Sequence, residues 1–267
     1  MKLLNKTKIW DDVEFTAVTS SGTTMLLTLK DWVQKNIFLF GYYEKNETDF
    51  WNNLTQHKNI VFDIGANVGY YGLIASKKIN PHGKVFGFEP VSHIYKRAEH
   101  NIKLNGIQNF ILNNIALSDK VGELTINVGN DANLGMSGIN HHNYLSGISE
   151  VVKVETVDHY VNSNNISQID VIKIDVEGSE SYVLKGMERS VADFKPTILI
   201  EILDTLLLKA GSSKEEIYNY MWAKNYQAFK IINGTEVQCI STPESFDGLT
   251  LFKHKEIAFD DFVKVLS

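Results

Sequence analysis

The residues best suited to bind a ligand lie in the segment VFDIGANVGYYG, residues 61–72, where an apolar strand is expected to run into glycines that open a helix. Such a turn brings the main chain close to a ligand. Asn67 stands between Gly65 and Gly69, and this order breaks the G-x-G-x-x-G pattern of dinucleotide sites, which disfavours NAD. Asp63 ends the strand, where a carboxylate would repel a phosphate but suit a cation or an amino group. The segment therefore favours a ligand with an amino acid end and an adenosine end.

A second acidic residue, Glu89, ends the next expected strand, KVFGFEP, 26 residues after Asp63. An acidic side chain at this place can accept both hydroxyl groups of a ribose. Taken singly, Asp63 could cap the helix that follows it, and Glu89 could cap the helix that starts near Val91. Together with the glycines, the two carboxylates favour a ligand site over two separate caps.

Carboxylates also follow two later strands. The run IDVIKIDVEG ends in Asp175 and Glu177, whose spacing of two places both on one face of a strand. Such a pair is costly because like charges repel, and it persists chiefly where a cation, a metal or a substrate proton is handled. Glu201 interrupts the apolar run TILIEIL, so it is either a buried carboxylate or a strand-end residue that faces solvent. These three residues are candidates for a general base.

His141 and His142 are the alternative candidates for the base. They lie in the glycine- and asparagine-rich stretch 129–148, a 20-residue loop that is too long to be idle. They could line an acceptor site, act as the base, or be a solvated pair. No H-x-x-x-H spacing accompanies them, so we predict no metal site, although three carboxylates offer the oxygen ligands that magnesium or calcium takes.

Length and composition narrow the class of protein. The 267 residues fit one domain with added elements, and 43% hydrophobic with 22% charged residues is typical of globular chains. The net charge of −6 is spread along the chain, which disfavours a nucleic acid partner. No window reaches the roughly 18 apolar residues of a membrane span, and the first residues lack the apolar stretch of a signal peptide, so we expect a cytoplasmic protein. The single cysteine, Cys239, excludes an internal disulfide.

The elements expected to position these residues fall into two parts. Residues 1–50 hold short β-like runs, EFTAV and TTMLLTL, and an aromatic run whose residues 38–43 alternate as a half-buried strand does. We interpret this part as an N-terminal extension packed on the core, and the aromatic run as packing rather than a sugar platform. In residues 51–267, apolar strands alternate with amphipathic helices, which indicates βαβ units and a parallel sheet. An Asn-Gly turn between QAFKII and EVQCI predicts a closing hairpin.

The motifs VFDIGANVGYYG and GFEP resemble the first two cofactor motifs of class I S-adenosylmethionine-dependent methyltransferases. DVIKIDVEGSESYVLKGM resembles the signature of the FkbM family within that class, and GYYE, NIALSD and PTILIEI agree with it. The resemblance covers roughly residues 38–253. It implies a Rossmann-like α/β fold: a mostly parallel seven-stranded sheet with helices on both faces and an antiparallel final hairpin.

The resemblance also implies roles for individual residues. The glycine turn with Gly65, Asn67 and Gly69 would border the methionine end of S-adenosylmethionine, and Asp63 would fix its amino group through the loop. Glu89 would bind the ribose. The remaining cofactor contacts implied are Asn114 and Ala116 near adenine, and Glu44 at the mouth of the site.

We therefore expect an S-adenosylmethionine-dependent O-methyltransferase that acts on a hydroxyl of a sugar or sugar-bearing metabolite. A polyketide, lipid or nitrogen acceptor stays open, as does a cofactor-binding protein without catalysis. A nicotinamide dehydrogenase is disfavoured by the glycine order and by Asp63. The sequence leaves the oligomeric state open.

Overall fold

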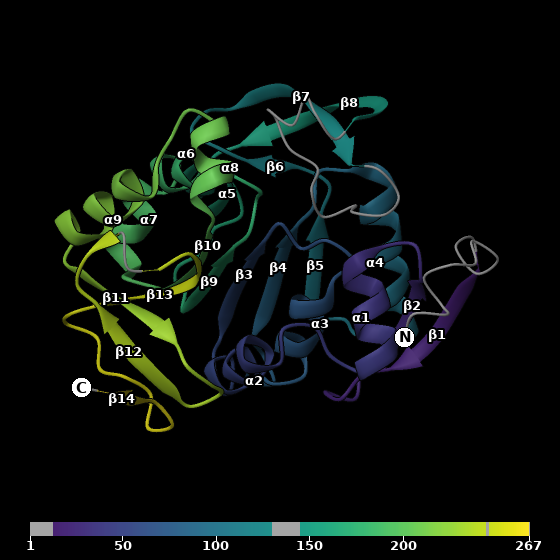
Figure 1. Ribbon diagram of the computed structural model, residues 1–267, viewed down its shortest axis with the longest axis horizontal. Coiled ribbons are helices and arrows are strands. Elements are labelled where there is room, and N and C mark those ends of the chain that lie inside the picture. Colours follow the sequence, from purple (N-terminus) through teal and green to yellow (C-terminus); the bar gives the residue numbers. More distant parts are fainter. Residues whose placement is uncertain (1–12, 130–144, 244–245, 267) are drawn as a thin grey trace.

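The computed structural model describes residues 13–129, 145–243 and 246–266 of the chain. Within these ranges, nine strands form one central sheet in the order β14-β12-β11-β13-β10-β9-β3-β4-β5 (Figure 1). Their bounds are β3 Ile60–Ile64, β4 Lys84–Phe88, β5 Phe110–Asn113, β9 Val171–Ile174, β10 Thr197–Ile202, β11 Tyr226–Ile231, β12 Glu236–Ile240, β13 Gly248–His254 and β14 Lys264–Leu266.

The five strands β10, β9, β3, β4 and β5 are all parallel, as the alternation of strands and helices predicts. From β3 the chain moves outward through β4 to β5, then returns to β9 on the other side of β3 and continues to β10. The direction of winding therefore reverses between β3 and β9. Open α/β sheets bind ligands at the carboxyl ends of the strands on either side of such a reversal.

Helices cover both faces of the sheet. Their bounds are α1 Trp32–Phe40, α2 Lys45–Leu54, α3 Tyr70–Ser76, α4 Ser92–Leu104, α5 Val157–Ser163, α6 Glu180–Lys185, α7 Glu188–Phe194, α8 Asp204–Lys209 and α9 Lys214–Ala223.

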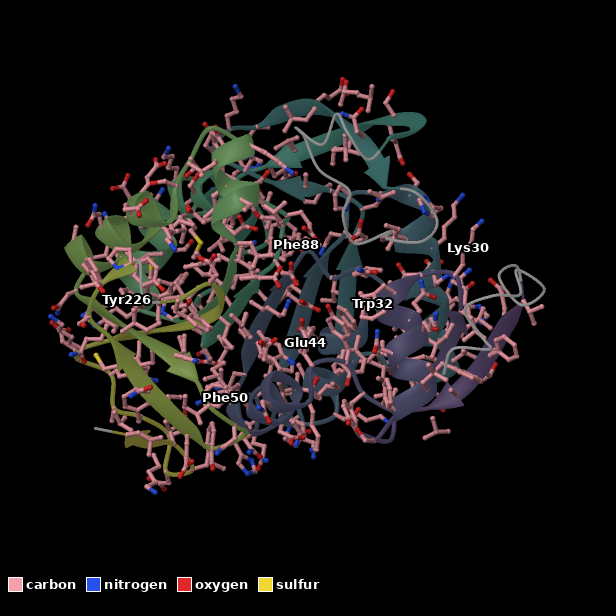
Figure 2. All side chains as sticks on the ribbon, in the orientation of Figure 1. Lys30, Trp32, Glu44, Phe50, Phe88 and Tyr226 are labelled. Atoms are coloured by element: carbon pink, nitrogen blue, oxygen red, sulfur yellow. The ribbon has the colours of Figure 1, made fainter. Side chains whose placement is uncertain are left out.

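Two apolar clusters show why the central strands carry almost no polar residues. Val61, Val85 and Leu199 pack on one face with side chains from α1 to α4. Side chains of a strand alternate between its two faces, so Phe62 and Phe88 pack on the other face, with side chains from α5 to α9. Figure 2 labels Phe88 near the middle of the molecule and Tyr226 of the same cluster in the β11 part. A strand buried on both faces must be apolar at every position, so any charged residue in it calls for an explanation.

The expected hairpin is confirmed, because β11 and β12 pair antiparallel on either side of Asn233 and Gly234. It does not close the sheet, however. β13 lies antiparallel between β10 and β11, and β14 adds an edge strand next to β12. The sheet thus has nine strands among the described residues rather than the seven that the family resemblance implies.

A smaller sheet lies beyond the carboxyl ends of the parallel strands (Figure 1). It has the order β6-β8-β7, with bounds β6 Ala116–Leu117, β7 Gly122–Gly129 and β8 Leu145–Glu155. The run FILNNIAL is divided between β5 and β6, which join different sheets. The runs ELTINV and VVKVETV pair antiparallel as parts of β7 and β8.

The N-terminal extension pairs β1 (Glu14–Val18) with β2 (Thr24–Thr28), as the two β-like runs predict. Residues 38–40 of the aromatic run form the end of α1 and residues 41–43 follow it, so the expected strand over 38–43 is wrong. Asp31 caps α1 by accepting a hydrogen bond from the main-chain N of Gln34 at 2.9 Å, and Gly41 ends it in the left-handed conformation. These two caps outweigh the short alternation of aromatic residues. No helix in the described ranges is long and apolar enough to cross a bilayer.

Candidate functional site

The glycine turn after β3 sits where the winding of the sheet reverses. Gly65 has φ +84, and a Cβ added there would lie 1.8 Å from the carbonyl oxygen of Asp175. The main-chain N of Gly65 donates to the carbonyl of Phe88 at 3.0 Å. Only glycine combines this backbone conformation with so close an approach. The turn is therefore packed directly against the ends of both β4 and β9.

Glu89 lies just past the end of β4 and faces this turn. Its carboxylate accepts hydrogen bonds from the main-chain N of Asn67 at 3.0 Å and of Val91 at 2.9 Å. Burial raises the pKa of Glu89 to about 7, against the effect of these two donors. The side-chain amide of Asn114 donates to the carbonyls of Glu89 and Pro90, which fixes the path of the chain behind the carboxylate.

A cavity of about 460 Å³ opens at the carboxyl ends of β3, β4, β9 and β10. Gly65, Asn67 and Glu89 line one part of it, and Asp175, Glu177 and Glu201 line another. Its lining also includes the apolar residues Val91, Ile94, Ala116, Leu117, Leu124 and Ile126. The volume is in the range of cavities that hold small molecules and cofactors.

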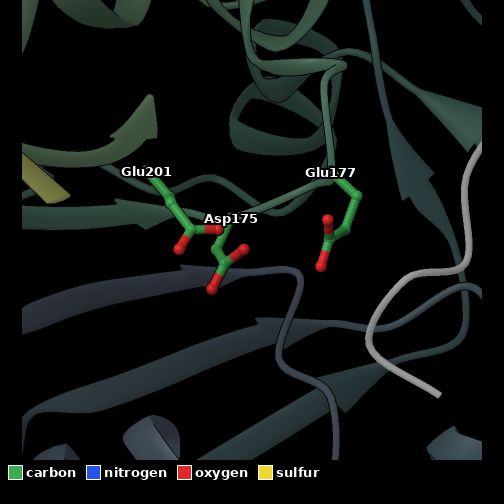
Figure 3. A group of neighbouring side chains, drawn as sticks. All are labelled: Asp175, Glu177 and Glu201. Atoms are coloured by element: carbon green, nitrogen blue, oxygen red, sulfur yellow. The ribbon is translucent and has the colours of Figure 1, made fainter. Parts of the chain in front are cut away.

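The three candidate carboxylates meet at this cavity. Asp175, Glu177 and Glu201 each place one oxygen so that all three lie within 4.8 Å of one another. Figure 3 shows the carboxyl groups of Asp175 and Glu201 side by side, with Glu177 reaching toward them from the following turn. The sequence predicts Asp175 and Glu177 on one strand face, and this prediction is wrong. β9 ends at Ile174, and Glu177 has φ +54, so the pair is gathered by a turn.

The turn is held by a buried acid of the next helix. One oxygen of Glu180 accepts from the main-chain N of Val176 and of Gly178, both at 3.1 Å. These bonds stabilise the left-handed conformation of Glu177 between them, which a non-glycine residue adopts only when its surroundings impose it.

Lys173 also lines the cavity, and it is not among the residues predicted from the sequence. It lies in the middle of the central strands, and its side chain is 3% exposed. Its Nζ is 2.7 Å from Oδ2 of Asp175 and 4.4 Å from the ring centre of Tyr71. In the sheet it stands directly beside Asp63 of β3. The signal was present in the run VIKID, since a lysine within an apolar strand buried on both faces needs a counter-charge.

This lysine sets the charges of the neighbouring acids. Burial acts to raise the pKa of Asp175, but the charge and hydrogen bond of Lys173 outweigh it and lower that pKa. The charge of Asp175, then burial, raise the pKa of Glu201, whose carboxyl hydrogen-bonds to that of Asp175. Asp175 is therefore the ionised member of the pair and Glu201 the protonated one. Burial, with the charge of Asp175, raises the pKa of Glu177 to about 8.

The structure brings together most of the predicted site residues. The three carboxylates, Gly65, Asn67, Glu89 and Ala116 line the cavity, whereas Asp63, Gly69, Asn114 and Glu44 are not part of its lining. Asp63 is 1% exposed, and burial raises its pKa to about 6. Gly69 has φ +86 at the start of α3, and Glu44 accepts from the hydroxyl of Tyr71 at 3.3 Å (Figure 2). His141 and His142 lie outside the described residues.

Comparison with known proteins identifies the family. A family model described as the methyltransferase FkbM domain matches residues 63–228, well over half of the chain. The chain belongs to the FkbM methyltransferase family. This confirms the membership that the glycine turn and the KIDVEG motif indicate, and with it the Rossmann-like α/β fold class.

Two curated relatives match part of this FkbM-family chain. The hexuronic acid methyltransferase AglP of Haloferax volcanii is 28% identical over 148 residues, which are 55% of this chain and 57% of that protein. Methyltransferase 1 of Beauveria bassiana is 20% identical over 164 residues, which are 55% of this chain and 66% of that protein. The chain thus spans less than two thirds of the length of either relative.

Solved structures of methyltransferases are similar to the chain. Methyltransferase FkbM from Methylobacillus flagellatus has a TM-score of 0.48 and 17% identity, covering 74% of this chain and 44% of that one. The O-methyltransferase from Bacillus cereus, solved in complex with SAH, has a TM-score of 0.48 and 13% identity, covering 78% of this chain and 80% of that one.

Proposed function

We propose that the chain is an S-adenosylmethionine-dependent O-methyltransferase that acts on a hydroxyl of a sugar or sugar-bearing metabolite. The observation that carries the proposal is one cavity with a glycine turn and a buried Glu89 in one part and three gathered carboxylates in the other. The family membership supports methyl transfer, and the name of the Haloferax relative supports a sugar acceptor.

The residues present suit the two ends of this cofactor. Glu89 offers a carboxylate to the ribose hydroxyls, and the apolar wall near Ala116 and Leu117 suits adenine. The main chain at Gly65 and the acids beyond β9 suit a ligand end that carries positive charge. When bound, the cofactor supplies an electrophilic methyl group on a sulfonium.

The chain itself must orient the acceptor hydroxyl and take up its proton. A base works best when its pKa lies near the working pH, and among the three acids Glu177 comes nearest to this, with a pKa of about 8. Glu201 holds a proton in its hydrogen bond to Asp175, and one oxygen of each lies within 4.8 Å of an oxygen of Glu177. These two acids therefore complete the acceptor side of the cavity. The apolar wall of Ile94, Leu124 and Ile126 also suits an acceptor with an apolar portion, which keeps a polyketide or lipid as the second candidate.

The test uses binding first and turnover second. S-adenosylhomocysteine should raise the melting temperature of the protein, whereas NAD should not, because a ligand stabilises only the state that binds it. Methyl transfer from labelled cofactor to a panel of glycosides and sugar nucleotides then identifies the acceptor. A protein stabilised by NAD and indifferent to S-adenosylhomocysteine would refute the proposal. The cytoplasmic location and the lack of a nucleic acid partner stay predictions from composition.

A further inference from the structure

Two residues of the N-terminal extension line the cavity. They are Val33 of α1 and Tyr43, which stands in the linker 41–44 between α1 and α2. Both lie outside residues 63–228, the part of the chain that the family model matches. The extension therefore supplies a piece of the cavity wall that the matched domain does not contain.

The linker is held in place at both ends and in the middle. Gly41 ends α1 with φ +78, and its carbonyl accepts a hydrogen bond from the main-chain N of Ser20 at 2.7 Å. The main-chain N of Tyr43 donates to Oη of Tyr70 at 3.3 Å, and the carbonyl of Tyr43 accepts from Oγ1 of Thr48 at 2.5 Å. Tyr70 begins α3, the helix that follows the glycine turn. The backbone of Tyr43 is thus fixed directly to the cofactor half of the cavity.

Glu44 fixes the side chain of Tyr43 as well. It has φ +44, a conformation that a residue other than glycine keeps only when its surroundings impose it. Its carboxyl group accepts from the hydroxyl of Tyr71 at 3.3 Å and is hydrogen-bonded to the hydroxyl of Tyr43. The ring of Tyr71 lies 4.4 Å from Nζ of Lys173, the cation that pairs with Asp175. One network therefore joins the linker to the acids at the end of β9.

The hydroxyl of Tyr43 lies on the side of the cavity that holds these acids. Burial raises its pKa, and the charges of Glu44, Asp175 and Glu201 raise it further. Charges act in this way only over short distances in a protein near water. The hydroxyl therefore stays protonated. Because its proton is directed to Glu44, its oxygen can accept a hydrogen bond from a ligand in the cavity.

We propose, on the basis of the function proposed above, that Tyr43 binds the acceptor. A hydroxyl or amino group of the acceptor, next to the reacting hydroxyl, donates a hydrogen bond to Oη of Tyr43. A tyrosine suits this role because its rigid ring offers a large contact area and loses little conformational entropy on binding. The N-terminal extension then sets part of the acceptor specificity, whereas the glycine turn and Glu89 hold the cofactor.

The first measurement needs no acceptor. Tyr43→Phe removes one hydroxyl and keeps the ring, so its melting temperature and its affinity for S-adenosylhomocysteine in titration calorimetry should match those of the wild type. Tyr42→Phe is the matched control. Tyr42 is the preceding residue of the same linker, its ring lies 5.6 Å from Nζ of Lys45, and it is not part of the cavity lining.

The second measurement uses aryl glucoside, galactoside and mannoside as acceptors. For the best of these, Tyr43→Phe should lower kcat/KM by about 3- to 30-fold, the effect expected when a ligand loses one hydrogen-bond acceptor in a closed site. Tyr42→Phe should keep the wild-type value.

Monodeoxy forms of that glycoside then identify the bond. The form that lacks the hydroxyl bound by Tyr43 should be methylated equally well by the wild type and by Tyr43→Phe, because each change removes the same interaction. A merely structural effect of the substitution would instead lower kcat/KM for every form alike.

The outcomes separate this inference from the proposed function. A wild type that does not bind S-adenosylhomocysteine, or that methylates none of the glycosides, overturns the proposed function and the inference with it. Normal kcat/KM in Tyr43→Phe, or an equal loss with every deoxy form, overturns only the inference. Weaker binding of S-adenosylhomocysteine in Tyr43→Phe also overturns it, since Tyr43 would then belong to the cofactor part. A loss that vanishes with one deoxy form, with normal cofactor affinity, supports the inference.

Discussion

Replacement of Lys173 by methionine should destabilise the folded protein severely. It should do so without a large packing defect, because methionine nearly fills the volume of the lysine side chain. The lysine is buried in β9, and its loss leaves Asp175 and Asp63 without their nearby cation. Breaking a buried ion pair from one side costs about 3 to 5 kcal/mol. The side chain of Asp175 keeps 29% of its surface exposed to the cavity, so water can reach the stranded carboxylate. We therefore expect the lower end of that range, about 3 kcal/mol.

Chemical denaturation of the single and double variants measures this. Asp175→Asn alone leaves Lys173 with Asp63 and Glu201 as neighbouring acids, so it should cost less than Lys173→Met. The double variant Lys173→Met with Asp175→Asn removes both charges, so it should recover much of the loss in Lys173→Met, with a coupling of about 1 to 3 kcal/mol in the double-mutant cycle. If the two effects simply add, the ion pair is not what stabilises the carboxyl end of β9, and our account of the charges on Asp175 and Glu201 is wrong.

Four further predictions concern the cavity. Glu89→Ala should weaken S-adenosylhomocysteine by about 1.5 to 3 kcal/mol in calorimetry, because the ribose loses a charged acceptor; unchanged affinity would contradict its role. Gly65→Ala should lower the melting temperature as well as binding, since its Cβ would overlap the carbonyl of Asp175; normal melting would show that the two loops can separate. Glu177→Gln should reduce the rate of single-turnover methyl transfer by a factor of about 10² to 10⁴ and abolish the rise of that rate toward pH 8. A normal rate would point to Glu201, or to His141 and His142, as the base. The pKa of Glu177 is raised in the folded protein, so its contribution to the free energy of unfolding is complete below the unfolded pKa of about 4.5 and is lost as the pH rises toward about 8. Melting curves should therefore show Glu177→Gln more stable than the wild type at pH 8 but not at pH 4.

Strong local patterns made much of the fold predictable. The apolar runs of β3, β4 and β10 and the turn at Asn233 each carry their own signal, and the structure confirms them. Strand order is set by pairings between distant segments, so the insertion of β13 between β10 and β11 left no local trace. The short alternation of aromatic residues predicts a strand at the end of α1. The helix caps at Asp31 and Gly41 are the stronger signal, and the structure follows them.

The residues of the candidate site also differ in how far the sequence alone predicts them. Gly65, Glu89 and Asp175 could be found because their types and positions at strand ends are unusual. The place of Glu177 depends on main-chain bonds to Glu180, and that of Lys173 on neighbours in β3. Neither set of contacts is visible in one segment of sequence. A lysine inside an otherwise apolar strand is nevertheless a sign that an acid faces it, and it could have been used.

The missing side chain at Gly65 ties the evolution of two loops together. Because the turn after β3 touches the carbonyl of Asp175 with no space between them, the loop that approaches the ligand and the loop that carries the acids form one mechanical unit. An insertion or deletion in either would displace the other, so the two segments can change only in concert. The three atoms nearest to a Cβ placed at Gly65 belong to Asp175 and Val176, whereas Leu124 and Ile126 of the smaller sheet also line the cavity. New acceptor preferences are thus expected to arise by replacement at these two positions, while the acids and the glycine turn stay fixed relative to each other.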